Sequence, residues 1–231
     1  MRRTRTGHAR ESRTGGDLTT AGRIRDAAII RFGRDGFGVG LRVIAADAHV
    51  TAGLVIHHFG SKEGLRQVCD DHVLAVLREE KEKALVDGTA ANLIARVAEV
   101  ESFVPIVRYL MRSFQAGGDL ARSLAEHMIA DAEEYLAAGE SAGVIRPSRD
   151  RAARARFLAY QNVGGMLVWF ALNSEAEDGD DAHFSASFRR YVEQIMFPAL
   201  ELYTQGLYVD RTMLDDYLMY VPDPPAGDDA A

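Results

Sequence analysis

The sequence has little of what several classes of protein require. Its 231 residues include one cysteine, Cys69, which excludes an internal disulfide and is typical of a protein in a reducing cytoplasm. No apolar run approaches the roughly 20 residues that cross a bilayer, and the first residues lack the apolar stretch of a secretory signal. The 47% apolar and 26% charged composition is that of a globular chain. We therefore expect a cytoplasmic protein without a membrane span.

Motifs for catalysis and cofactor binding are also missing. We find no nucleophile elbow, no phosphate-binding glycine loop and no dinucleotide fingerprint. Three histidines near residues 49–58 and the Cys69–His72 pair raise the alternative of a metal site. However, adjacent histidines on a helix point in different directions, and no carboxylate pair completes the histidine set. For Cys69 and His72, a helix face with a buried thiol is the favoured interpretation. We predict no enzyme activity, no cofactor and no metal.

The charge is unevenly distributed, although the chain as a whole has a net charge of −7. Residues 1–66 contain 12 Lys and Arg against 6 Asp and Glu, a net charge of +6. The remaining residues contain 15 basic and 28 acidic side chains, a net charge of −13. This asymmetry indicates a polyanion-binding N-terminal part and a body with another role. The alternative is a basic unstructured arm beside a solvated acidic domain.

Apolar residues recur at helical spacing along most of the chain, and no segment alternates as a half-buried strand does. Residues 1–17 and those beyond Val221 have few large apolar side chains and are expected to be flexible. Thr51, Ser61 and Ser148 are suited to be N-caps, and Gly143 to be a C-cap. The sequence predicts an all-α fold of about nine helices, over residues 19–35, 41–47, 51–58, 61–83, 90–100, 106–114, 119–142, 148–172 and 183–205.

A helix, a short joint and a second helix capped by Thr51 form the layout of a helix-turn-helix, whose second helix enters the major groove of DNA. Residues 36–65 read GFGVGLRVIAADAHVTAGLVIHHFGSKEGL. This stretch closely resembles the DNA-binding signature of TetR-family transcriptional regulators, in residue types and in spacing. The resemblance covers about residues 20–66, and the rest of the chain is similar only in being helical and of suitable length.

The resemblance and the chemistry of the side chains together suggest which residues contact DNA. Arg42 is the best candidate for bidentate contact with guanine, with a phosphate contact as the near-equal alternative. Lys62, beside a helix N-terminus, is the candidate for a phosphate contact. The first turn of the recognition helix supplies short or apolar side chains, and the next turn supplies two histidines. The predicted DNA-binding residues are Arg42, Thr51, Ala52, Gly53, Leu54, His57, His58 and Lys62.

Three positions depart from the family pattern. Gly40 stands where Ser or Thr is common, and His49 stands where the joint usually has Gly, although His tolerates a left-handed backbone. Ile56 replaces an aromatic hydroxyl residue and removes a phosphate donor. The arginines at positions 2, 3 and 5 would replace part of this lost contact with DNA if the N-terminal arm follows the DNA backbone or minor groove. An arm that has no such role is an equal alternative.

For the body, the resemblance implies a homodimer and a cavity for a small-molecule effector. The two long helices near the C-terminus would pack against their copies, with Phe157, Gly164, Val168, Phe188, Val192 and Ile195 at the interface. Aromatic and thioether side chains would line a cavity for a largely apolar ligand, although ordinary core positions are the alternative for each. The predicted lining residues are Phe103, Tyr109, Met111, Phe114, His127, Met128, Tyr135 and Trp169.

We therefore predict four segments: a flexible basic arm (1–17), a DNA-binding domain (18–66), a ligand-binding and dimerisation domain (67–210) and a C-terminal segment with an acidic tail (211–231). The predicted function is a ligand-responsive regulator, commonly a repressor in this family, that binds double-stranded DNA at a palindromic operator. A helical protein-interaction module and a small helical enzyme are the alternatives. The first leaves the basic helix-turn-helix without a role, and the second requires a polar reactive cluster that the sequence does not offer.

Overall fold

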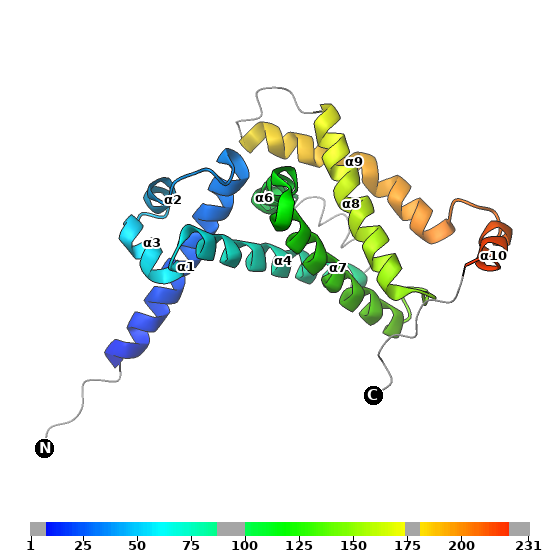
Figure 1. The fold of residues 1–231 in the computed structure, drawn as a ribbon, viewed down its shortest axis with the longest axis horizontal. Coiled ribbons are helices and arrows are strands. Elements are labelled where there is room, and N and C mark those ends of the chain that lie inside the picture. The colour runs from blue at the N-terminus through cyan, green and yellow to red at the C-terminus, as the bar shows by residue number, and fades with distance from the viewer. Residues whose placement is uncertain (1–7, 87–99, 174–180, 222–231) are drawn as a thin grey trace, which may run out of the picture. The chain divides into compact units, whose positions relative to one another are not determined.

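The computed structural model describes residues 8–86, 100–173 and 181–221, and these contain nine α-helices, one short 3-10 helix and no strand (Figure 1). The predicted all-α fold is confirmed. The chain forms two compact units. The first unit comprises Met1–Lys83 and Ser102–Met128, and the second comprises Ala84–Glu101 and Ile129–Ala231.

The first unit is built from α1 (His8–Asp35), α2 (Leu41–Asp47), α3 (Ala52–Phe59), most of α4 (Lys62–Val86), α6 (Val104–Ala116) and the first part of α7 (Gly118–Ser141). Its core forms because α1 to α4 and α6 each contribute apolar side chains to one cluster. The side chains at its centre have no exposed surface: Ile24, Ala28, Phe32, Ile44, Val55, Leu65, Cys69, Val73 and Tyr109.

Helix α1 begins earlier than the sequence pattern predicts. It starts at His8, so the segment from His8 to Asp17 is helical and not part of a flexible arm. Once the core residues of a helix are fixed, each added residue gains a backbone hydrogen bond without a new nucleation step. The preceding arginines at positions 2, 3 and 5 lie outside the described residues.

The second unit contains the end of α7, then α8 (Arg151–Asn173), α9 (Asp181–Gln205) and α10 (Thr212–Leu218). Rings from α8 and α9 pack together, with Phe170 stacked on Phe184 at a centroid distance of 5.0 Å. The Trp169 indole N–H donates to Gln194 Oε1 at 2.7 Å, and the Tyr203 hydroxyl donates to Gln161 Oε1 at 3.1 Å. These contacts make α8 and α9 an antiparallel pair.

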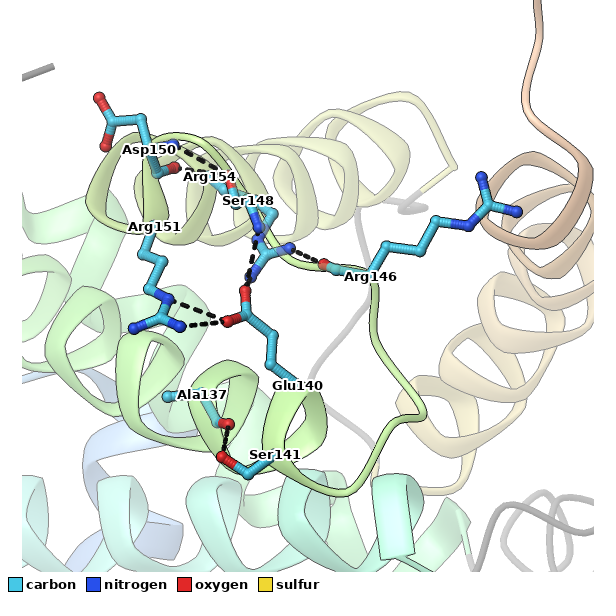
Figure 2. Close-up of polar contacts among 8 residues, drawn as sticks. All are labelled: Ala137, Glu140, Ser141, Arg146, Ser148, Asp150, Arg151 and Arg154. Carbon is cyan, nitrogen blue, oxygen red and sulfur yellow. Dashed lines mark hydrogen bonds and ion pairs between the residues drawn. The ribbon is translucent and has the colours of Figure 1, made fainter. Parts of the chain in front are cut away.

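The corner between α7 and α8 is held by one carboxylate (Figure 2). Glu140 is only 5% exposed and accepts from the Arg151 guanidinium (Nε, 2.9 Å), from Arg154 and from the Ser148 backbone N–H (3.1 Å). Burial alone would raise the pKa of Glu140, but the hydrogen bonds from Arg154, Ser148 and Arg151 outweigh it and hold the pKa below its ordinary value.

Of the two helix caps predicted at this corner, Gly143 is confirmed and Ser148 is wrong. Gly143, with φ of 73°, follows the end of α7 as predicted. Ser148 does not cap α8, because the helix starts three residues later and Asp150 accepts from the Ala153 N–H at 2.8 Å. The Ser148 hydroxyl instead accepts from the Asp150 N–H at 3.2 Å, within the turn that precedes the helix.

Other predicted helices are confirmed with small shifts of their ends, including the last long helix, which contains Pro198. Helix α10 was not predicted. The predicted helix over 90–100 lies outside the described residues except at Val100, which begins the 3-10 helix Val100–Phe103. Residues 174–180, before α9, and the tail beyond Val221 lie outside the described residues as well.

Candidate nucleic-acid interface

The joint between α2 and α3 has the geometry of a helix-turn-helix. His49 adopts a left-handed backbone with φ of 55°, as the sequence predicts for the position that often carries glycine. Thr51 then returns to an extended conformation, and its hydroxyl accepts from the Leu54 N–H at 3.2 Å. This bond satisfies one free N–H of the first turn and fixes where α3 begins.

One face of α3 is fixed to the rest of the unit. Val55 has no exposed surface and lies in the core with Ile44 and Ala45 of α2. Val50 and Phe59 pack against the same core at the two ends of α3. These contacts leave the opposite face and the N-terminal turn of α3 exposed. Figure 1 shows α3 beside α1 and α2.

The predicted DNA-contacting residues differ in how exposed they are. Arg42, Thr51, Gly53 and His57 are exposed. A Cβ at Gly53 would meet only the Thr51 hydroxyl, at 3.9 Å, so a surface could approach the backbone closely there. The remaining four are partly buried: Ala52, which packs against the core, Leu54, His58 and Lys62.

Two cations of this set are available to a phosphate or base. Within the described part of the chain, Arg42 and Lys62 have no hydrogen bond or ion pair. Arg31, in contrast, is held by Asp47 and Asp35, with Nη1 at 3.0 Å from the Asp35 carboxylate. The hydrogen bond from Arg31 lowers the pKa of Asp47, and the same bond raises the pKa of Arg31. Arg31 therefore joins α1 to α2 and is committed within the protein.

Gly64 is a structural requirement of the site that the sequence analysis did not identify. A Cβ at this position would lie 2.2 Å from the Phe59 carbonyl oxygen, a separation that no side chain can accept. The approach is close because Ser61 accepts from the Gly64 N–H at 3.0 Å and starts α4 directly after α3. The signal available in the sequence was a glycine in the first turn of a helix, where it is otherwise unfavourable.

Tyr109, a predicted ligand residue, lies in the core of the first unit. It has no exposed surface, its ring contacts Phe32 and Phe37, and its hydroxyl donates to Asp70 Oδ1 at 2.6 Å. Burial raises the pKa of the Asp70 carboxyl, although the hydrogen bond from Tyr109 opposes this, and burial also raises the pKa of Tyr109. Helix α6 is thus bound to α1 and α4 within the unit that carries the DNA-contacting residues.

Helices α1 and α6 also pack closely, because the glycine at position 33 lets their backbones approach each other. A Cβ at Gly33 would lie 3.1 Å from the Tyr109 backbone nitrogen and 3.1 Å from the Arg108 Cβ. Arg112 also donates to the Arg34 carbonyl at 3.2 Å. Near this interface, burial raises the pKa of the Cys69 thiol to about 12, so the thiol stays protonated and unreactive in the folded protein.

The predicted ligand residues are divided between the two units. Those in the first unit, together with Tyr109, are Phe103, Met111, Phe114, His127 and Met128; Met111 is buried and His127 is exposed. Tyr135 and Trp169 belong to the second unit, Tyr135 beside the Ala132–Leu136–Ala155 cluster and Trp169 in the aromatic group between α8 and α9. A ligand site formed by these eight residues stays a prediction.

The predicted dimer residues are mostly accessible on the second unit. Phe157 is 63% exposed, Val168 59% and Ile195 42%, whereas Gly164 and Val192 are partly buried. Phe157, Gly164 and Val168 follow a spacing that places them on one face of α8. Phe188 differs, because it is buried within its own chain beside Tyr191. The interface itself stays a prediction.

Comparisons with known proteins agree with this geometry. Residues 24–69 match the family model for bacterial regulatory proteins of the tetR family, and residues 101–209 match the model for the tetracyclin repressor-like C-terminal domain. The transcriptional regulatory protein RaaS of Mycobacterium tuberculosis, an HTH-type regulator, is 50% identical over 202 residues, which cover 87% of this chain and 93% of that protein.

Two solved structures are similar at lower identity. Thermus thermophilus FadR, a TetR-family repressor in complex with lauroyl-CoA, is 21% identical with a TM-score of 0.46, over 90% of this chain and 100% of that chain. Salmonella enterica GusR is 20% identical with a TM-score of 0.46, over 78% of this chain and 96% of that chain.

The site and the family matches together define a DNA-binding transcriptional regulator with a helix-turn-helix. The chain belongs to the TetR family, whose members are regulators and not enzymes. None of the described helices is long and apolar enough to cross a membrane. Among the described residues, no group of three His, Cys, Asp or Glu side chains could hold a metal ion.

Proposed function

We propose that this protein is a homodimeric repressor that binds a palindromic operator in the bacterial cytoplasm and is released by a small, largely apolar effector. The observation that carries the DNA part is the open N-terminal turn of α3, flanked by Arg42 and Lys62 without partners among the described residues. In a two-fold dimer the two copies of α3 would enter successive major grooves, roughly 34 Å apart or at a related spacing.

The division of roles within the site follows from the chemistry of the side chains. Arg42 is exposed on α2 and is assigned to base contact, because a guanidinium can donate twice to guanine. Lys62, at the first residue of α4, is assigned to a phosphate, where the helix N-terminus adds favourable charge. Thr51 and Leu54 are placed to contact backbone and thymine methyl groups.

Release by an effector requires a path from the body to α3. Helix α4 begins two residues after the end of α3 and continues beyond the first unit, so a shift of α4 would move the recognition helix. An effector that binds better to the altered arrangement lowers the population that can bind the operator. The aromatic and thioether residues predicted to line the cavity favour an apolar effector.

Selection of bound fragments from genomic DNA tests the proposal and requires no assumption about the operator sequence. The expected outcome is a recovered sequence with two-fold symmetry, protected from cleavage on two successive grooves and bound by two chains per site. A recovered site without internal symmetry, bound by one chain, would contradict the dimeric arrangement. A fluorescent apolar dye added to the complex tests the effector class: displacement of DNA by the dye is expected, and displacement only by polar metabolites would exclude an apolar effector.

A further inference from the structure

The C-terminal segment Leu207–Tyr220 carries an apolar surface that no other part of the described chain covers. None of the residues of α10 is buried, and Val209 in the preceding loop is fully exposed. Tyr208, Met219 and Tyr220 are 64%, 80% and 86% exposed. An exposed apolar patch of this kind on a globular domain marks an interaction surface.

Helix α10 has two distinct faces. At 100° per residue, Met213, Leu214, Tyr217 and Leu218 fall on one side of the helix, and Asp215 and Asp216 fall on the other. Met213, Leu214 and Tyr217 are 61%, 51% and 65% exposed. A helix of seven residues is not stable alone in water, so its apolar face requires a surface to pack on.

The position of α10 within the second unit indicates where that surface lies. The bond from Tyr203 to Gln161 places the end of α9 beside α8, and the bond from Trp169 to Gln194 continues the antiparallel pairing. The chain that leaves α9 therefore emerges at the end of the pair where α8 begins (Figure 1). If two α8–α9 pairs pack about a two-fold axis parallel to the helices, these ends of both copies lie together.

The start of α8 is complementary in charge to α10. The basic corner, which we define as residues 146–156, contains five arginines and one aspartate. Arg151 and Arg154 neutralise Glu140, while Arg146 and Arg156 are exposed. The guanidinium of Arg146 points away from the Glu140 network in Figure 2. Leu207–Tyr220 contains three aspartates and one arginine, and the sequence that follows adds three more aspartates.

We propose that Leu207–Tyr220 crosses to the second copy of the chain, where α10 packs its apolar face over the partner's α8 and the acidic C-terminal segment as a whole lies beside the partner's basic corner. The inference rests on the proposed homodimer and adds an exchanged C-terminal segment to it. The acidic side of α10 argues against DNA or an anionic membrane as the occupant, because both would be repelled. Packing on the same chain is disfavoured because the apolar face is uncovered although the basic corner is within the same unit.

Cysteine cross-linking between differently tagged full-length chains tests the crossing. One chain carries Leu214→Cys and the other carries Arg146→Cys, and the natural Cys69 is buried and protonated, so it adds no background. A short bis-maleimide is expected to join the two chains after mixing. The control pair replaces Arg146→Cys with Asn173→Cys, an exposed position at the opposite end of α8 in the same unit, and is expected to give no product. Cross-linking within a single chain that carries both cysteines, without any product between chains, would overturn the proposal.

Sedimentation of full-length variants gives an independent measurement. Replacing Met213, Leu214 and Tyr217 by serine is expected to raise the dimer dissociation constant at least about tenfold, which corresponds to roughly 1.4 kcal/mol. Ile30→Ser, which removes an exposed apolar side chain of α1, is the matched control and is expected to have no effect. If the natural protein is a dimer and the triple variant has the same dimer dissociation constant, the exchanged segment is refuted and the proposed homodimer is not. A natural protein that stays monomeric would refute the proposed homodimer as well.

Discussion

The hydrogen bond between Tyr109 and Asp70 predicts how firmly α6 is held to the DNA-binding unit. Tyr109→Phe removes only the hydroxyl that donates to Asp70 Oδ1 at 2.6 Å. A hydrogen bond to a charged group contributes about 1.5–3 kcal/mol, and the partly buried carboxylate would lose this donor. The free energy of opening of the first unit should fall by that amount, which is roughly a ten- to hundredfold rise in the open population.

The single cysteine supplies the assay. Cys69 has no exposed surface and lies in the same core, so a thiol reagent labels it only when the first unit opens. The labelling rate of Tyr109→Phe should therefore exceed that of the natural protein by roughly ten- to a hundredfold at neutral pH. Tyr203→Phe is the control, because Tyr203 donates to Gln161 in the second unit, and its labelling rate should not change.

The pH dependence sharpens the test. Burial raises the pKa of Asp70 in the folded protein, so ionisation of Asp70 costs stability as the pH rises from its unfolded to its folded pKa. Because the Tyr109 hydroxyl lowers that pKa, the Phe variant should pay a larger cost at neutral pH than at acid pH, where the carboxyl is protonated. A labelling rate unchanged by Tyr109→Phe, or raised equally by both variants, would refute the role assigned to this bond.

Two further predictions concern stability. Gly64→Ala should destabilise the first unit by about 1–3 kcal/mol in urea unfolding, because its Cβ would meet the Phe59 carbonyl at 2.2 Å. Gly22→Ala in α1, where a Cβ meets nothing within 4 Å, should instead stabilise it by about 0.5–1 kcal/mol, and equal effects of the two would contradict the close approach at Gly64. Glu140→Gln should destabilise the second unit at neutral pH, and the difference in stability from the natural protein should vanish as the pH falls through the lowered pKa of Glu140. Trp169 fluorescence measures unfolding of this unit. A difference in stability that does not change with pH would exclude ionic stabilisation at the corner.

The sequence predicted those features that depend on local chemistry. Ile24, Ala28 and Phe32 recur every four residues, a spacing that indicates one apolar face of a helix, and all three have no exposed surface. The cap at Thr51 and the left-handed turn at His49 were also predicted, because each follows from one residue and its neighbours. The helix-turn-helix was therefore accessible from the sequence alone.

Features that depend on distant residues were not predictable in the same way. The partner of Tyr109 is 39 residues away in the chain, and no local pattern shows that α6 completes the core around α1. At the start of α8, Ser148 and Asp150 are both good caps, and the choice depends on Glu140, which accepts from the Ser148 N–H. Helix α10 is too short to produce a recognisable period.

The central claim is that the helix-turn-helix contacts DNA, with Arg42 on α2 contacting bases and Lys62 at the start of α4 contacting a phosphate. The most direct measurement is the affinity of Arg42→Ala and Lys62→Ala for the selected operator and for a scrambled duplex over a range of salt, with Arg122→Ala as a control of equal charge. Arg42→Ala should lower the preference for the operator by about 1–3 kcal/mol. Lys62→Ala should weaken both duplexes alike and reduce the salt slope by about one. Equal behaviour of all three variants, or no salt-dependent duplex binding by the natural protein, would contradict the account.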